Sequence, residues 1–141
     1  MQRLLVPVDG SENALRAVKY AIGFAQSTSQ PAELHLLHVQ EPVPSHVHAY
    51  FSVSDIEKMG TDAAEKILQP ARRLCDEAAV SCITHARVGP IAQTIAACAG
   101  ELQCNAIIMG TRGMGAIASL IIGSVTAKVI HLASVPVTLV K

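Results

Sequence analysis

Glycine residues gather after a short apolar run in the last third of the chain. Gly110, Gly113 and Gly115 follow the uncharged residues 105–109 and precede a second apolar stretch. Glycine allows positive φ angles, and it lets a ligand approach the main-chain amides closely. A helix that begins after such a turn adds unpaired N–H groups and a partial positive charge. The segment therefore predicts a binding site for an anion.

Gly123 lies within the second apolar stretch, and Ser124, Val125 and Thr126 come directly after it. Glycine inside a helix costs about 1 kcal/mol relative to alanine, so Gly123 favours a helix that starts here, with Ser124 as its cap. Micromolar affinity requires about −8 kcal/mol. A helix dipole supplies at most ~2 kcal/mol, and each hydrogen bond to a charged group supplies roughly 1.5–3 kcal/mol. Two converging groups of amides and hydroxyls therefore favour a triphosphate chain over a single small anion.

Two common nucleotide-binding motifs fit this segment only in part. The spacing of Gly110 and Gly115 resembles the start of a P-loop, but Ala116 stands where that motif requires lysine. A dinucleotide fingerprint requires an acidic residue about 20 positions further on, and no acidic residue follows Glu101. Both P-loop binding and dinucleotide binding are therefore disfavoured.

The charge distribution is compatible with an anion site. All eleven acidic residues lie at or before Glu101, and the only charged residues after it are Arg112, Lys128 and Lys141. An acid-free segment favours a bound anion, although chance in so small a count explains the distribution equally well. Arg112 lies within the glycine segment, where it is either a bidentate phosphate ligand or a solvated loop residue.

These residues require a scaffold that brings distant parts of the chain together. Short runs rich in Val, Ile and Leu alternate with segments of helical period, which is typical of a parallel sheet covered by helices on both faces. We predict one doubly wound α/β domain over residues 1–141, with a five-stranded parallel sheet flanked by four helices. The five predicted strands are residues 4–8, 33–39, 81–88, 105–110 and 136–140.

The helices are predicted between these runs. Ser11 is the expected N-cap of the first helix. Residues 40–54 contain two prolines and no clear period, so we predict a long loop there. A helix follows over residues 55–79, capped by Asp55 and kinked or broken at Pro70, because an interior proline costs about 3 kcal/mol or more. Its inward face is predicted to contain Ala63, Ile67, Ala71 and Leu74.

Composition argues against several functional classes. The 141 residues carry a formal net charge of zero and no Trp, which leaves no charged footprint for nucleic acid and little surface for stacking bases. The longest uncharged run, residues 113–127, is shorter than the 18 or more apolar residues of a membrane span. The apolar run at the N-terminus is too short for a signal peptide. We therefore expect neither nucleic acid nor membrane as a partner.

The cysteines and histidines indicate a reducing compartment and no metal site. Cys75, Cys82, Cys98 and Cys104 form no C-x-x-C pair, so they are interpreted as small buried thiols of a cytoplasmic protein. The pair His46 and His48 lacks a third ligand and is interpreted as part of a solvated loop. His35 and His38 are three apart on a predicted strand, so they point to opposite faces and cannot chelate a metal together, and we expect local hydrogen bonds to satisfy His85 and His131.

The spacing Gly110-x2-Gly113-x9-Gly123-Ser124, together with Val-Pro-Val-Asp-Gly-Ser at residues 6–11, resembles the signature of the ATP-binding branch of the universal stress protein family. The likeness spans the whole chain. It implies a Rossmann-like fold with strand order 3-2-1-4-5. It also implies a small cytosolic protein that binds ATP, alone or with Mg²⁺, and acts as a sensor or switch in the stress response.

The same resemblance implies the residues of the ligand site. Those expected to flank the adenine and ribose are Pro7, Val8, Asp9 and Val39. Those expected around the ribose and phosphates are Met109, Gly110, Arg112, Gly113, Gly123, Ser124, Val125 and Thr126. Asp9 and Gly110 can face one ligand because strand ends converge where the strand order reverses. Asp9 then accepts hydrogen bonds from sugar hydroxyls or from a metal-bound water; the alternative is a turn residue before the helix at Ser11.

Rapid chemistry is not expected at this site. The segment has no P-loop lysine, no evident base and no second acid for magnesium, so we assign no catalytic residue. One alternative is a slow Mg-dependent ATP hydrolase that uses Asp9 and Arg112. Another is a ligand-free dimerisation module in which the glycines only build turns. Residues 135–140 form an apolar strand expected at a sheet edge, and we predict a homodimer through it.

Overall fold

The computed structural model describes residues 1–111 and 122–141, and it contains one five-stranded parallel sheet in the order β3-β2-β1-β4-β5. The predicted fold class and strand order are therefore confirmed. In chain order the elements are β1 (Gln2–Pro7), α1 (Glu12–Ser27), β2 (Ala32–Gln40), the 3₁₀ helix η1 (Ser45–Ala49), α2 (Val53–Glu77), β3 (Cys82–Val88), α3 (Ile91–Glu101), β4 (Ala106–Gly110), α4 (Ser124–Leu132) and β5 (Val137–Val140).

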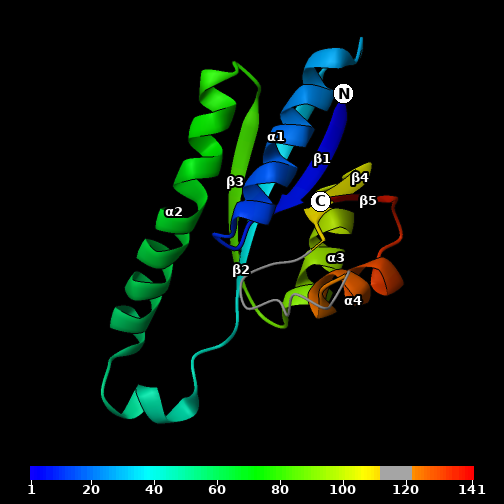
Figure 1. Cartoon of the computed structure of the whole chain (residues 1–141). Coiled ribbons are helices and arrows are strands. Elements are labelled where there is room, and N and C mark those ends of the chain that lie inside the picture. The colour runs from blue at the N-terminus through cyan, green and yellow to red at the C-terminus, as the bar shows by residue number, and fades with distance from the viewer. Residues whose placement is uncertain (112–121) are drawn as a thin grey trace.

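The sheet separates two hydrophobic core layers. Figure 1 shows α1 and α2 over one face and α3 and α4 over the other. Successive strand residues point to opposite faces, so β1 buries Leu4 and Val6 in the α1–α2 layer and Leu5 in the α3–α4 layer. This two-sided burial explains why the central strands are continuous apolar runs in the sequence.

The helix caps agree with the prediction for α1 and correct it for α2. The Ser11 hydroxyl oxygen accepts the Ala14 N–H at 3.1 Å, as an N-cap does. Helix α2 begins at Val53, two residues before the predicted start, because Ser52 and not Asp55 is its cap. The predicted loop before it contains η1, which the sequence pattern did not indicate.

Helix α2 continues through Pro70 to Glu77, so of the predicted kink or break the break does not occur. Pro70 lies on the exposed side of the helix, while Leu68 and Ala71 are buried against the sheet on either side of it. Packing of these neighbours keeps the helix continuous. The predicted inward face is shifted by one residue at its start, since Ala63 is exposed and the buried residues are Ala64, Leu68, Ala71 and Cys75.

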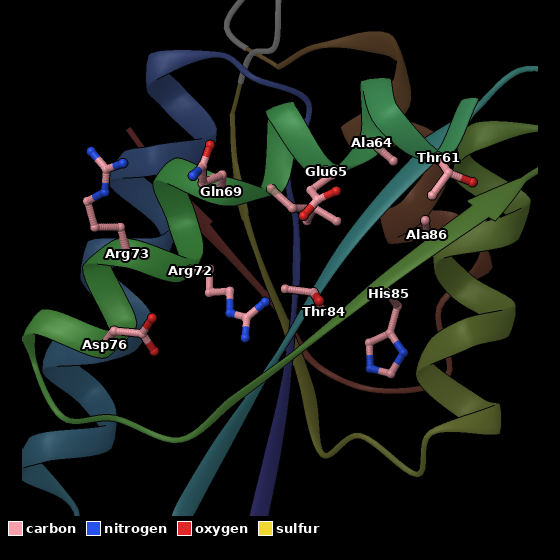
Figure 2. A pocket seen from close by; sticks show the side chains of 11 residues that line it. Thr61, Ala64, Glu65, Gln69, Arg72, Arg73, Asp76, Thr84, His85 and Ala86 are labelled. Atoms are coloured by element: carbon pink, nitrogen blue, oxygen red, sulfur yellow. The ribbon is translucent and has the colours of Figure 1, made fainter. Parts of the chain in front are cut away.

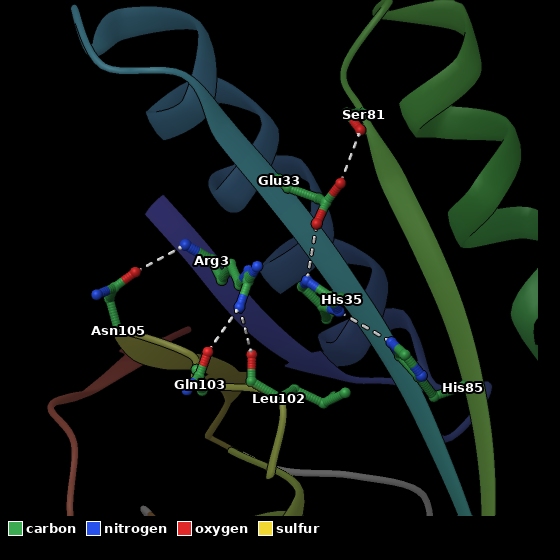
Figure 3. Close-up of polar contacts among 8 residues, drawn as sticks. All are labelled: Arg3, Glu33, His35, Ser81, His85, Leu102, Gln103 and Asn105. Atoms are coloured by element: carbon green, nitrogen blue, oxygen red, sulfur yellow. Dashed lines mark hydrogen bonds and ion pairs between the residues drawn. The ribbon is translucent and has the colours of Figure 1, made fainter. Parts of the chain in front are cut away.

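A chain of polar side chains connects β2 with the edge strand β3 (Figure 3). His35 Nδ1 lies 2.9 Å from His85 Nε2, and His35 Nε2 lies 3.0 Å from Glu33 Oε1. The Ser81 hydroxyl donates to Glu33 Oε2 at 3.4 Å. The two imidazole rings stack with their centroids 5.1 Å apart. A neutral histidine carries one ring N–H. His85 donates this proton to His35, and His35 donates its own to Glu33, so two neutral histidines satisfy both hydrogen bonds.

The first turn of α1 packs tightly on the end of β4. A Cβ atom added to Gly110 would lie 3.0 Å from the backbone carbon and oxygen of Asn13 and 3.0 Å from its Cβ. Glycine is therefore required here by the close approach of two main-chain segments. In contrast, a Cβ atom added to Gly23 in α1 would meet nothing within 4 Å.

We predict opposite effects for two glycine substitutions. Gly110→Ala forces α1 away from β4 and lowers the free energy of unfolding by about 1–3 kcal/mol, as overpacking typically does. Gly23→Ala adds a methyl group into open space in a helix and raises it by about 0.5–1 kcal/mol. Urea denaturation of the two variants measures both changes. Equal effects of the two substitutions would contradict the packing role of Gly110.

The histidine pair predicts acid sensitivity. Burial, followed by the charges of His35 and Arg87, lowers the pKa of His85 below its ordinary value of 6.5. Neutral His85 thus contributes stability that is fully present above pH 6.5 and is lost as the pH falls through the lowered pKa. Urea denaturation between about pH 7.5 and pH 5 should show a steeper loss for the wild type than for His85→Gln, which keeps a hydrogen-bond donor. Parallel profiles would exclude this contribution.

Candidate functional site

The carboxyl ends of β1, β2 and β4 meet at one edge of the sheet. The register aligns Pro7 with Leu37 and Leu5 with Ile107. The chain fills the sheet on one side of β1 and then returns to its other side, so the strand order reverses between β1 and β4. Doubly wound proteins bind ligands at such a switch point, beyond the carboxyl ends of the strands.

A short turn after β1 carries Asp9 at this edge. Asp9 Oδ1 accepts the Ser11 N–H at 2.9 Å, and Gly10 has a φ of +87°, a conformation that favours glycine. Asp9 is exposed. The turn role weighed as the alternative for Asp9 is therefore present. A ligand role stays a prediction, because a carboxylate accepts more than one hydrogen bond.

His38 fixes the end of β1 from the neighbouring strand. Its ring nitrogen Nδ1–H donates to the Val8 carbonyl at 2.7 Å, and both side chains are buried. The Val8 N–H donates to the Leu37 carbonyl at 2.8 Å. His38 thus sets where the Asp9 turn begins. The sequence analysis did not find this role, because one histidine in a strand carries no signal for its hydrogen-bond partner.

Two hydrogen bonds join the end of β4 to the start of α4. The Thr126 hydroxyl donates to the Gly110 carbonyl at 3.1 Å, and the Gly123 N–H donates to the Thr111 carbonyl at 2.7 Å. Thr111 is in turn bonded to β5, since its N–H donates to the Val140 carbonyl at 3.0 Å. The end of β4 at Gly110 and Thr111 therefore lies beside the start of α4 at Gly123.

Among the described residues, no side chain caps the N-terminus of α4. Gly123 is the N-cap residue, and Ser124 is the first helical residue, so the prediction of Ser124 as the cap is wrong. The reason is that Gly123 itself adopts the extended conformation of an N-cap and donates its N–H to Thr111. The amides of residues 124–126 have no acceptor within the helix. They form a positively polarised helix end that can bind an anion.

Most of the predicted site residues offer main-chain groups, and not side chains, to a ligand at this edge of the sheet. Val8, Val39, Met109 and Thr126 are buried, and Val125 packs against the α3–α4 core layer. Pro7, Gly110 and Gly123 are half-buried, whereas Asp9 and Ser124 are exposed. Arg112 and Gly113 lie outside the described residues. Asp9 and Ser124 are thus the described members of the set whose side chains can reach a ligand.

The described residues limit the chemistry in two further respects. Within residues 1–111 and 122–141, no group of three His, Cys, Asp or Glu side chains could hold a metal ion. Among the helices in these ranges, none has the length and hydropathy of a membrane-spanning segment. What the edge offers is a set of N–H donors, one helix end and the Asp9 carboxylate.

Comparisons with known proteins show the family to which the chain belongs. The model of the universal stress protein family matches residues 1–141. A universal stress protein from Thermus aquaticus is 33% identical over 138 residues, which are 98% of this chain and 97% of that protein.

Solved structures give the same result. Protein MJ0577 superposes with a TM-score of 0.85 at 26% identity, over 99% of this chain and 95% of that one. A universal stress protein solved in complex with cAMP has a TM-score of 0.74 at 24% identity, over 99% of this chain and 97% of that one. The resemblance seen in the sequence is confirmed: the chain belongs to the universal stress protein family.

Proposed function

We propose that this chain binds an adenine nucleotide, ATP, at the carboxyl ends of β1 and β4 and acts as a sensor or switch in the stress response. The observation that carries the proposal is the uncapped start of α4, which two hydrogen bonds hold beside the end of β4. An anion-binding helix end there lies at the switch point of the sheet. The family member solved with cAMP supports an adenine nucleotide as the ligand class.

The residues divide between the two parts of the nucleotide. The main chain at Pro7, Val8 and Val39 flanks the adenine, and the exposed Asp9 carboxylate accepts hydrogen bonds from the ribose or from a water of Mg²⁺ that accompanies ATP. The amides of residues 124–126 and the Ser124 hydroxyl bind the phosphates. We assign Met109, Gly110, Arg112, Gly113 and Gly123 to the same phosphate side.

Binding without rapid turnover fits these groups best. Hydrogen-bond donors alone position phosphates, whereas fast hydrolysis also needs a group that orients the attacking water and one that neutralises the developing charge. The sequence has no lysine in the P-loop position. A cytoplasmic location fits the four free cysteines, because disulfides are rare in that compartment.

The direct test is to identify the nucleotide that the protein carries. Freshly purified protein is denatured, and any released nucleotide is separated by chromatography. The emptied protein is then titrated with ATP, ADP, AMP and cAMP by calorimetry. We expect saturable binding of ATP, and ADP production with Mg²⁺ distinguishes the slow hydrolase. No released nucleotide together with no binding heat would leave the ligand-free module as the function.

Ser124 provides a substitution with opposite effects on stability and binding. Ser124→Asp places a negative charge at the start of α4, which should stabilise the free protein by about 0.3–1 kcal/mol. The same charge repels phosphates and should weaken ATP binding by about tenfold or more, which is a loss of about 1.4 kcal/mol. Calorimetry and urea denaturation measure the two effects. Ser124→Asn is the neutral control, and equal ATP affinities of the two variants would contradict the phosphate site.

We also propose a homodimer through β5 and the residues before it, 135–140. Strand β5 pairs with β4 on one side, and its other side is an edge of the sheet. Leu139→Lys places a charge on this short apolar strand and should lower the mass measured by sedimentation velocity. An unchanged mass would remove this edge from consideration.

A further inference from the structure

A groove of about 520 Å³ lies between α2 and the edge strand β3, away from the carboxyl ends of the strands. Figure 2 shows that its walls come from one face of α2 and from the middle of β3. Thr61, Glu65, Arg72 and Asp76 line it along the helix. Its position along the sheet edge makes it suitable for another chain that adds to β3.

The backbone of β3 is prepared to accept such a chain. The Ser81 carbonyl accepts the Leu34 N–H, and the Gly89 N–H donates to the Gln40 carbonyl, so the odd-numbered residues face β2. In a parallel strand the two polar groups of one residue point to the same side. The amides and carbonyls of Thr84 and Ala86 therefore point outward. The strand contains neither Lys nor Pro, two residues that commonly protect sheet edges, and Arg87 near its end is its one charged residue of the Lys, Arg, Asp or Glu type.

The charged residues of α2 that line the groove complement those of a second α2 that runs in the opposite direction. Glu65 and Arg72 are seven residues apart on α2, which places them on one face two turns apart. Neither forms a hydrogen bond or ion pair with the other residues that the structure describes. If a second α2 runs antiparallel beside the first, Glu65 meets Arg72 of the partner subunit, and Arg72 meets Glu65 of the partner subunit. The contact therefore occurs twice.

Helix α2 and strand β3 line the groove together. In Figure 2 the Arg72 side chain extends toward Thr84, and Thr61 lies near Ala86. Residues 84–86 of β3 therefore lie opposite the stretch of α2 between Thr61 and Arg72, which contains Glu65. A two-fold axis that passes between two copies at His85 pairs their β3 strands antiparallel and places their α2 helices antiparallel on the same face of the joined sheet. Such an interface uses the same surface on both subunits.

We propose that a second copy of this chain binds here, with β3 of the two copies paired antiparallel about His85. Thr84 and Ala86 of the partner subunit then exchange two backbone hydrogen bonds, and symmetry repeats them. Glu65 and Arg72 of the partner subunit form an ion pair across the groove, again twice. The two sheets continue into one, and the groove is filled by the partner's side chains.

The pairing also accounts for the exposed apolar residues of β3. Ile83 is 43% exposed and Val88 is 67% exposed. In the proposed register Ile83 lies opposite Arg87 of the partner subunit, whose aliphatic stem covers it. Val88 lies opposite Cys82 of the partner subunit. Both apolar side chains lose contact with water when the strands pair.

The test reverses single charges of the groove in a chain that can no longer associate through its β5 edge. Leu139→Lys serves as the background, so that only the β3 edge can associate, and sedimentation velocity gives the mass. We expect this chain to form a dimer, whereas in the wild type the β3 contact links the β5 homodimers into larger assemblies. Adding Glu65→Arg or Arg72→Glu should raise its dissociation constant at least tenfold, because like charges then face each other twice. Lys66→Glu, a charge reversal outside the groove, is the matched control.

Two combinations distinguish pairing from general destabilisation. A chain with both Glu65→Arg and Arg72→Glu should dimerise again. An equal mixture of the two single variants should form a heterodimer, since at these two positions each arginine of one chain then meets a glutamate of the other. A Leu139→Lys chain that stays monomeric, a Glu65→Arg variant that still dimerises, or a mixture that stays monomeric would each overturn the proposal. ATP titration of the variants keeps this result separate from the nucleotide site.

Discussion

The contact between the end of β4 and the start of α4 is the constraint on which the candidate site depends. Thr126 and Gly123 donate to the carbonyls of Gly110 and Thr111, so the first turn of α4 cannot move away from the strand. On its other side Gly110 is held by the backbone of Asn13. The end of β4 is therefore fixed between two helices, and the free amides of α4 are fixed with it.

A site built in this way uses main-chain groups, while its side chains serve the core. Val8, Val39, Met109 and Thr126 are all buried, so their replacement changes packing before it changes recognition. Main-chain donors depend on the fold and not on residue identity. The same fold persists in MJ0577 with only 26% identity, so most side chains differ while the backbone is kept.

The sequence predicted the sheet well because the strands are buried on both faces and the helices carry a clear apolar period. The predictions from the sequence failed where tertiary packing determines the local structure. Pro70 was expected to kink or break α2, and the helix is not broken there because Leu68 and Ala71 hold it against the sheet. The cap of α4 was assigned to Ser124, since propensity does not show that the Gly123 N–H is bonded to Thr111. The pairing of His35 with His85 also needed the strand register.

The candidate nucleotide site and the groove of α2 and β3 lie on different parts of the sheet, one at the strand ends and one along an edge. Between them the chain runs from the end of β2 through η1 into α2, which carries Glu65 and Arg72 into the groove. Helix α2 is continuous from its cap at Ser52 to Glu77, so the seven-residue spacing of Glu65 and Arg72 is a helical spacing on both sides of Pro70. A helix broken at Pro70 would lose this spacing, and with it the alignment of charges on which the proposed pairing depends.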